Sequence, residues 1–527
     1  MDIKRAKKEI EDAVRAYLIK DDNGAYRMDV VRQRPILLIG PPGIGKSAII
    51  SQAAGDLKIG LVAYTMTHHT RQSIMGLPFI HEEELGGHTE NVTEYTMSEI
   101  IADIYRKIDE TNVKEGILFL DEINCVSETL APVMLMLLQN KRFGNEAVPA
   151  GWVIVAAGNP PEYNNSVHDF DVVTLDRMRR IDIEADFSAF KEYALNSSLY
   201  PAILSYLNIK QDNFYSIKTT VDGRRFVTAR GWEDLSSLLY AYDELGLKVD
   251  EKLVFEYLQD EKTASDFSNF LELYSKYRSN YDISDIISGN FLSSTENVPE
   301  GTADQGHAVQ PRFLKLAQSD FDERYSIIEL LVSSVINKVN NSAVFDSAVK
   351  KIYDALVKYK TAAPASELHF TEKNPSGIMT GLYDYLFSNL SRMEKLQPDE
   401  TEKKSNRLSL SFINDLKNNF QSCHPDPDTA IAIIRSEFAS FKSERISSIN
   451  DADSCIFNCL NFLDSLFGVS HEAVLFVTDL TLSASCMAFL TAHGDGSGAK
   501  SYFSHNSALL MDNSRSRILN EIEHFSI

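Results

Sequence analysis

The chain has few cysteines and no long apolar run. Its 527 residues include five cysteines, too few and too irregularly spaced for a disulfide framework, which indicates a reducing compartment. No stretch approaches the roughly 20 consecutive apolar residues that a membrane-spanning helix needs, and charges interrupt every apolar run near the amino terminus. We therefore expect a cytoplasmic protein that does not insert into a membrane.

Positive charge is also in deficit. The sequence has 52 lysines and arginines against 75 aspartates and glutamates, so its formal net charge is −23. This charge repels phosphate backbones and anionic membranes at long range, which argues against general nucleic-acid binding. Proline (16) and glycine (25) are sparse while 44% of the residues are hydrophobic, so the chain can bury two or three cores.

Apolar periodicity divides the chain into parts. After an amphipathic helix, short apolar runs alternate with helical patterns up to about residue 188, and this order predicts a parallel sheet covered by helices. Strand signals then fade, and a polar stretch rich in Gly, Ser, Thr and Pro is typical of a linker. The expected parts are an N-terminal helix (1–24), an αβα core (25–188), a helical segment (189–288), the linker (289–310) and a helical C-terminal domain of unknown role (311–527).

The strongest motif is GPPGIGKS at positions 40–47. It fits G-x-x-x-x-G-K-[ST] and lies between the apolar run RPILLIG and the helical run SAIISQAAG. In such a loop, backbone N–H groups and the helix N-terminus bind phosphate oxygens, the lysine reaches the β and γ phosphates, and the hydroxyl binds Mg²⁺. The expected nucleotide-binding residues are Gly40, Pro41, Pro42, Gly43, Ile44, Gly45, Lys46, Ser47 and Ala48, with Ser47 also a metal ligand.

Two further strand ends carry polar side chains suited to hydrolysis. The run ILFL is followed by Asp121, expected to hold Mg²⁺, and by Glu122, expected to polarise the attacking water as general base. The next strand ends before Asn159, whose amide can reach the γ-phosphate or the water if that strand lies beside the phosphate-loop strand. On local sequence alone, an asparagine before proline is more typical of a turn.

Taken in order, these motifs resemble those of the AAA+ ATPases, and within them the MoxR-like branch of the clade with a helix-2 insert. The resemblance covers residues 25–245 and rests on GPPGIGKS, LFLDEIN, the stretch from LAPVML to AAGNPP, LDRMRR and TARGWEDLS. It implies a P-loop NTPase αβα sandwich with a parallel sheet, a helical lid over 189–288, and Mg²⁺-dependent ATP hydrolysis in a ring, expected to be a hexamer. Asn159 would be sensor 1.

The resemblance also implies roles for two arginines and two insertions. Arg177, in LDRM, matches the arginine finger that enters a neighbouring subunit's site, with Arg179 and Arg180 as alternatives, and Met178 stands where the family has an aromatic residue. Arg230, in TARGW, matches the sensor 2 arginine of the lid. The helix-2 insert would be residues 76–98, and a hairpin before sensor 1 would be residues 142–152.

For the work done by hydrolysis, the resemblance implies chaperone-like remodelling of a protein partner, often a separately encoded von Willebrand-type protein. One alternative is a nucleic-acid-associated motor, helicase-like or of the GTP-using restriction type, against which the acidic balance argues. The other is a nucleotide-gated scaffold without turnover, which would not need the base Glu122. No residue distinguishes adenine from guanine.

Overall fold

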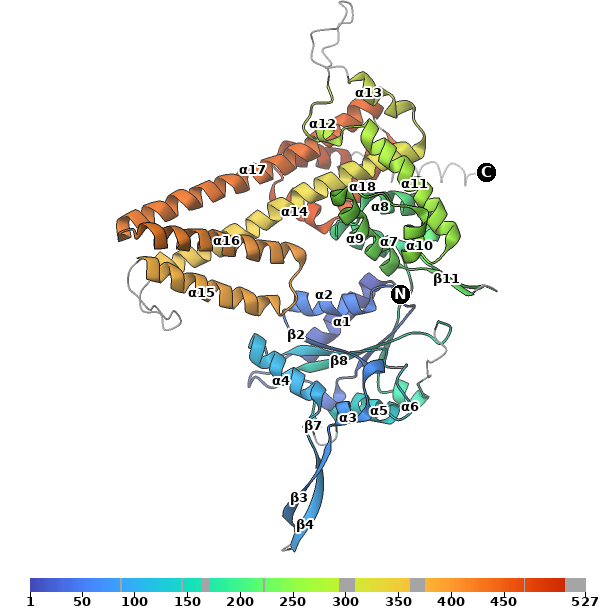
Figure 1. Cartoon of the computed structure of the whole chain (residues 1–527), viewed down its shortest axis with the longest axis vertical. Coiled ribbons are helices and arrows are strands. Elements are labelled where there is room, and N and C mark those ends of the chain that lie inside the picture. The colour runs from blue at the N-terminus through green and yellow to red at the C-terminus, as the bar shows by residue number, and fades with distance from the viewer. Residues whose placement is uncertain are drawn as a thin grey trace, which may run out of the picture. The chain divides into compact units, whose positions relative to one another are not determined.

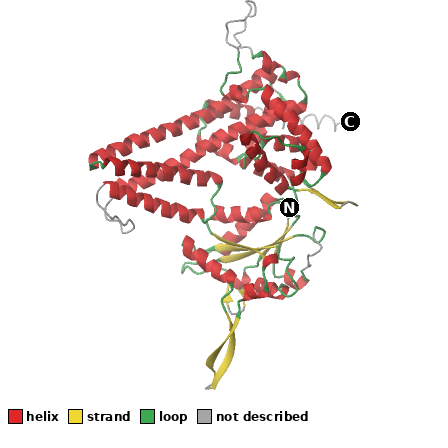
Figure 2. Ribbon diagram, in the orientation of Figure 1, coloured by secondary structure: helices red, strands yellow, loops and turns green. Residues whose placement is uncertain are grey.

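The chain is organised as two compact units. The computed structural model describes residues 1–85, 88–143, 146–163, 170–220, 223–292, 309–360, 375–468 and 470–507. Unit 1 comprises Met1–Ala189 and Tyr385–Lys403, and unit 2 comprises Phe190–Asp384 and Lys404–Ile527. Helices dominate unit 2, and the larger sheet belongs to unit 1 (Figures 1 and 2).

Unit 1 is built on a five-stranded parallel sheet with the order β2-β5-β8-β1-β9. This confirms the predicted parallel sheet of a P-loop NTPase. The strands are β1 (Ile36–Ile39), β2 (Gly60–Thr65), β5 (Gly116–Asp121), β8 (Trp152–Gly158) and β9 (Arg179–Asp182). The helices are α1 (Ile3–Tyr17), α2 (Lys46–Leu57), α3 (Arg71–Met75), α4 (Glu99–Thr111), α5 (Ala131–Asn140) and α6 (Val172–Leu175).

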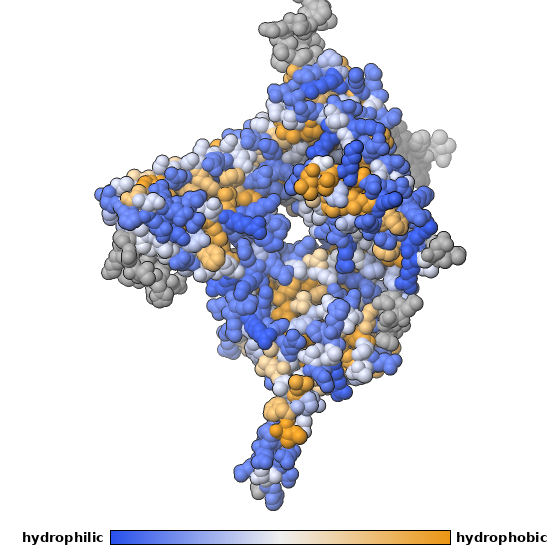
Figure 3. Space-filling model, in the orientation of Figure 1, coloured by the Kyte–Doolittle hydropathy of each residue, from blue (hydrophilic) through white to orange (hydrophobic). Residues whose placement is uncertain are grey.

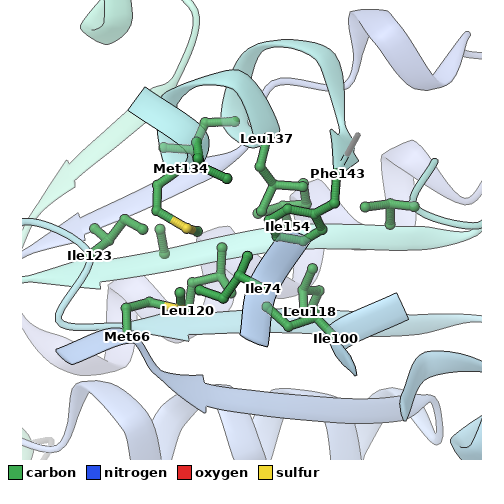
Figure 4. Close-up of a cluster of buried hydrophobic side chains, with 14 of the residues drawn as sticks. Met66, Ile74, Ile100, Leu118, Leu120, Ile123, Met134, Leu137, Phe143 and Ile154 are labelled. Carbon is green, nitrogen blue, oxygen red and sulfur yellow. The ribbon is translucent and has the colours of Figure 1, made fainter. Parts of the chain in front are cut away.

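One face of the sheet carries the main apolar cluster of unit 1 (Figure 4). Alternate residues of a strand point to the same side, so Leu118 and Leu120 of β5 join Ile154 of β8 in this cluster. Helices α4 and α5 cover them with Ile100 and Leu137, which are both fully buried. Because β5 is buried from Gly116 to Leu120 and β8 along its whole length, these stretches are continuous apolar runs, as central parallel strands require.

The Trp152 indole sets the spacing at the start of three strands. Gly60 pairs with Gly116, and Gly116 pairs with Trp152, whose side chain is fully buried. A Cβ at Gly116 would lie 2.6 to 2.7 Å from three atoms of the indole ring, closer than real Cβ contacts allow. Glycine is therefore required there by close approach of the ring rather than by a turn.

We predict that Gly116→Ala destabilises unit 1 by about 1–3 kcal/mol, because the buried indole has to move to admit the methyl group. Urea unfolding measures the change. Gly494→Ala is the control, because an added Cβ there meets one atom at an ordinary 3.6 Å. Equal stability of the two variants would contradict the prediction.

Two hairpins interrupt unit 1 where the resemblance places its insertions. β3 (Pro78–Leu85) and β4 (His88–Tyr95) form a two-stranded antiparallel sheet within residues 76–98. β6 (Arg142–Phe143) and β7 (Glu146–Ala147) pair within residues 142–152. Figure 1 shows β3 and β4 projecting away from the parallel sheet.

Unit 2 is mostly helical, with one hairpin that the helical pattern did not reveal, formed by β10 (Ser216–Thr220) and β11 (Gly223–Val227). Helix α17 is continuous over 41 residues, because no glycine or proline interrupts it after its first position. The other helices are α7 (Phe187–Asn196), α8 (Pro201–Ile209), α9 (Ala229–Leu245), α10 (Glu251–Tyr257), α11 (Glu261–Asn280), α12 (Ile283–Ile287), α13 (Pro311–Leu314), α14 (Phe321–Lys360), α15 (Pro375–Glu394), α16 (Glu400–Cys423), α17 (Pro427–Phe467), α18 (His471–Leu482) and α19 (Ala484–Ala492).

The expected lid and the helices beyond residue 311 share one core. Helix α14 packs against α8 and α11 on one side of the expected linker and against α17, α18 and α19 on the other. Residues 293–308 of the expected linker lie outside the described residues. At its ends, Leu292 and Val309 form an antiparallel bridge, and the Gln310 N–H donates to the Phe291 carbonyl at 2.9 Å. The two ends of this stretch therefore lie side by side in unit 2.

In the described part of the chain, no single helix combines the length and apolar composition needed to cross a membrane. Helices α18 and α19 meet that composition only as a pair, and they are bent by 91° at their junction.

A buried charged cluster joins α7, α8, α14 and α18. Glu329 and Asp479 are each 1% exposed. The Lys191 ammonium lies 2.6 Å from Asp479, while the Tyr325 hydroxyl and the Asn208 amide both donate to Glu329 Oε1 at 2.9 Å. Burial, and then the neighbouring Asp479 carboxylate, raise the pKa of Glu329 to about 8, although Lys191 opposes the shift.

We predict that stability falls as pH rises from the usual glutamate range towards about 8. In that window the folded state holds a proton on Glu329 that the unfolded chain has lost, so raising pH favours unfolding. Glu329→Gln should remove this dependence and stabilise the protein at about pH 9 by roughly a few kcal/mol. Urea unfolding at low and high pH measures it. The control Glu437→Gln changes an exposed residue of α17, and an unchanged pH profile in Glu329→Gln would be evidence against the prediction.

Candidate nucleotide site

The phosphate loop joins β1 to α2. Gly45 is the N-cap of α2 and has φ 96°, a left-handed conformation that residues with a side chain rarely adopt. No side chain caps the first turn of α2 in the described structure. The backbone donors at this helix N-terminus suit phosphate oxygens, so the loop fits the nucleotide that its sequence predicts.

The Lys46 ammonium is fixed by three neutral oxygens. It donates to the Gly40 and Pro41 carbonyls and to Asn159 Oδ1, each at 2.8 Å, and the residue is only 8% exposed. These contacts depend on the sheet, because β1 and β8 are neighbours in which Ile39 pairs with Gly158. The structure therefore brings Asn159 beside the loop, as expected of a side chain at the end of an adjacent strand.

Ser47 and Asp121 meet at the same edge of the sheet. The Ser47 hydroxyl donates to Asp121 Oδ2 at 2.6 Å, and the Glu122 N–H donates to Asp121 Oδ1 at 2.9 Å. A hydroxyl and a carboxylate are hard oxygen ligands of the kind Mg²⁺ prefers. The pair fits the predicted metal ligands.

Glu122 is held in an unusual backbone conformation. Its φ is 55°, in the left-handed region, which costs about 1–3 kcal/mol for a residue other than glycine and is typical of functional sites. Its carbonyl accepts from the Cys125 N–H at 3.0 Å, and its Oε2 accepts from the Thr67 hydroxyl at 2.9 Å. The turn and Thr67 thus orient the carboxylate beside Asp121.

Asn124 positions Asn159 through two reciprocal hydrogen bonds. Its Nδ2 donates to the Asn159 carbonyl at 2.7 Å, and its Oδ1 accepts from the Asn159 N–H at 3.3 Å. The side chain is 6% exposed. Sequence reasoning assigned no role to Asn124 or to Thr67. Asn124 nevertheless falls inside the LFLDEIN motif, whereas nothing in the local sequence marks Thr67.

We predict that Asn124→Ala lowers ATP turnover about tenfold or more, mainly through kcat, because the Asn159 amide and the Lys46 ammonium it contacts lose their orientation. Steady-state kinetics measure kcat and KM, and circular dichroism checks the fold. Asn418→Ala, on the exposed face of α16, is the matched control. If both variants turn over ATP like the parent chain, Asn124 does not position the site.

The three arginines around Met178 have different partners. Arg179 lies 2.7 Å from Glu9, and Arg180 lies 2.8 Å from Asp182, so carboxylates engage both. Arg177 is exposed and donates to the neutral Gln139 Oε1 at 2.6 Å, and its charge contributes to lowering the pKa of the Asp171 carboxyl after the hydrogen bonds from Thr174. A hydrogen bond to a neutral amide is weaker than one to a carboxylate. Arg177 can therefore leave Gln139 to bind another anion more easily than Arg179 or Arg180 can leave its carboxylate.

The register of β9 separates Arg177 from the phosphate loop of its own chain. Arg179 pairs with Ile36 at the amino end of β1, whereas Gly40 follows the carboxyl end. Four residues of strand correspond to about 13 Å, and Arg177 precedes β9 by two more residues. The structure therefore does not gather Arg177 with Lys46, Ser47, Asp121 and Asn159.

Arg230 belongs to unit 2. It is exposed in the first turn of α9, where the Thr228 hydroxyl caps the helix by accepting from the Gly231 N–H at 3.2 Å. The positive charge of Arg230 interacts unfavourably with the positive end of the helix dipole. Its position therefore does not stabilise α9 electrostatically.

Comparisons with known proteins find one family model and several solved structures that are similar to parts of this chain. Residues 35–178 match the AAA domain family described as the dynein-related subfamily. No match is found among curated proteins. Similar solved structures include a mutant of RuvB from Thermotoga maritima (14% identity, TM-score 0.29, covering 60% of this chain and 88% of that chain). NtrX from Brucella abortus is another (14% identity, TM-score 0.25, covering 63% of this chain and 66% of that chain).

The matched range begins just before β1 and ends just before β9, so it contains the phosphate loop, both carboxylates, Asn124 and Asn159. Residues 35–178 are thus similar to the AAA domain of the dynein-related subfamily.

Proposed function

We propose that this protein hydrolyses ATP with Mg²⁺ in a ring of identical subunits and uses the turnover to remodel a protein partner. The observation that carries the proposal is the pair of contacts Lys46–Asn159 and Ser47–Asp121, which unite three strand ends into one phosphate and metal site. The AAA domain supports nucleotide-dependent activity.

The chain's own residues divide the work. Lys46 and the loop residues from Gly40 to Ala48 bind the phosphates, and Ser47 and Asp121 hold the metal. Glu122, oriented by Thr67, accepts a proton from the attacking water. Asn159 reports the state of the γ-phosphate to β8. Bound Mg²⁺ supplies charge neutralisation on the β and γ phosphates.

Arg177 acts in trans in this proposal. Its place at the amino end of the sheet, and its neutral partner Gln139, support a role in a neighbour's site rather than in its own. A cation that arrives only on assembly couples hydrolysis to ring formation. Arg230 of the lid contacts the γ-phosphate, which would link unit 2 to the nucleotide state.

The MoxR-like assignment and the hexamer extend the proposal. The two hairpins β3–β4 and β6–β7 support it, because they occupy the positions at which that branch carries its insertions. A von Willebrand-type protein is the partner that this branch suggests. The few, irregularly spaced cysteines support a cytoplasmic location.

The test measures ATP turnover per subunit against protein concentration. Turnover should rise with concentration, and it should vanish in Glu122→Gln while ATP binding persists. If the parent chain binds ATP but turns it over no faster than Glu122→Gln at any concentration, the protein is a nucleotide-gated scaffold instead.

A mixing experiment tests the trans arginine. Lys46→Ala and Arg177→Ala should each be inactive, but an equal mixture should recover about a quarter of parental turnover, because one site in four then pairs an intact loop with an intact neighbouring arginine. Arg106→Ala, which removes an exposed arginine of α4, is the control and should need no rescue. Absence of recovery in the mixture would contradict the role of Arg177.

A further inference from the structure

The β3–β4 hairpin is strongly acidic and carries no Lys or Arg. Residues 78–95 hold five glutamates, and their only residues able to become cationic are His81 and His88. The glutamates are Glu82, Glu83, Glu84, Glu90 and Glu94. The hairpin is therefore more acidic than the chain as a whole.

The register places like charges directly opposite one another. Glu83 pairs with Glu90, and a cross-strand pair of like charges destabilises a sheet. The His81 ring lies 3.8 Å from Glu83 and 3.9 Å from Glu94, and within the described residues no lysine or arginine forms an ion pair with the five glutamates. A cation supplied from outside would relieve this repulsion.

Apolar side chains are exposed at the root of the same hairpin. Ile80 is 72% exposed and Leu77 58%, and Phe79, Tyr95 and Met97 are each more than 40% exposed. Figure 3 shows apolar surface near the root of the hairpin and hydrophilic surface towards its tip. Exposed apolar residues gathered in this way mark an interaction site more often than scattered ones do.

Both strands also have an unpaired edge, because in the described structure the sheet contains β3 and β4 alone. Two-stranded hairpins are marginally stable by themselves, and an extended segment can add to such an edge by main-chain hydrogen bonds. Its side chains then alternate between the two faces of the sheet.

We infer that the β3–β4 hairpin is the docking site for an extended segment of a protein substrate in which apolar residues adjoin a cluster of Lys or Arg. The apolar residues lie against Phe79 and Ile80 at the root, and the cations lie against the glutamates of the outer half. Nucleic acids and anionic membranes are repelled by the same charge. This inference deepens the proposed remodelling function, on which it rests, by naming the substrate class.

The competing explanation is that the glutamates only protect an exposed edge from self-association, as charged edge residues do in other proteins. The two explanations differ in whether a basic apolar segment binds. The probe is a fluorescein-labelled synthetic peptide with a run of alternating valine and threonine followed by a run of lysines. A second peptide with glutamates in place of the lysines is its control.

Binding to the full chain is measured by fluorescence anisotropy. We expect the lysine peptide to bind with an affinity that falls as salt is raised, and the glutamate peptide not to bind. The triple variant E83Q/E84Q/E90Q, in the outer half, and the double variant F79S/I80S, at the root, should each raise Kd about tenfold or more, since each removes one half of the surface. The matched control is E437Q/E444Q/D451N, which removes three exposed carboxylates of α17 and should bind like the parent.

Three results would overturn the inference: no binding of the lysine peptide to the parent chain, equal binding of both peptides, or a loss in the α17 control equal to that in the hairpin variants. If only one of the two hairpin variants binds the lysine peptide more weakly, the acidic and apolar halves do not act as one surface, and the inference is wrong in that case too. Sedimentation and circular dichroism verify that each variant is folded and unaggregated. Anisotropy needs no hydrolysis, and Glu122→Gln should bind the peptide, so failure of the ATPase proposal and failure of this inference are separable.

Discussion

The contact between the Lys46 ammonium and Asn159 depends on the pairing of β1 with β8, and the nucleotide site depends on that contact. Two strands that are far apart in the sequence must be neighbours, in parallel and in register, for the amide to meet the lysine. The buried runs of β5 and β8 and the indole packed on Gly60 and Gly116 maintain this register from the apolar core. Apolar packing at the amino ends of the strands thereby determines where the polar side chains at their carboxyl ends lie.

The two ends of the same sheet have different chemistry. The carboxyl ends collect the phosphate loop, Asp121 and Asn159, and the amino end of the edge strand β9 follows Arg177. A short parallel strand keeps these groups about 13 Å or more apart, so one chain cannot use both at one phosphate. In the proposed ring, this separation makes each subunit's turnover dependent on its neighbour.

Unit 2 has a single core where composition suggested a lid, a linker and a separate domain. Helix α14 is long enough to contact α8 and α11 as well as α17 to α19. The buried carboxyls of Glu329 and Asp479, with the Lys191 ammonium 2.6 Å from Asp479, lie among α7, α14 and α18. Moving charged groups out of water is costly. The cluster therefore holds these helices together only while Glu329 keeps its proton and the hydrogen bonds to it are formed. Movement of α8 and α11 therefore cannot be independent of the C-terminal helices.

The sequence by itself determined the parallel sheet, the phosphate loop, and the metal and base candidates Asp121 and Glu122. These depend on local patterns: short apolar runs, a glycine-rich turn before a helix, and acids at a strand end. Tertiary structure alone decided that Asn159 meets Lys46, that Thr67 and Asn124 support the site, and that Arg177 lies at the far end of the sheet. It also decided that the helices on both sides of the expected linker share one core. Strand order and helix packing join residues distant in the chain, and no local pattern encodes which of them become neighbours.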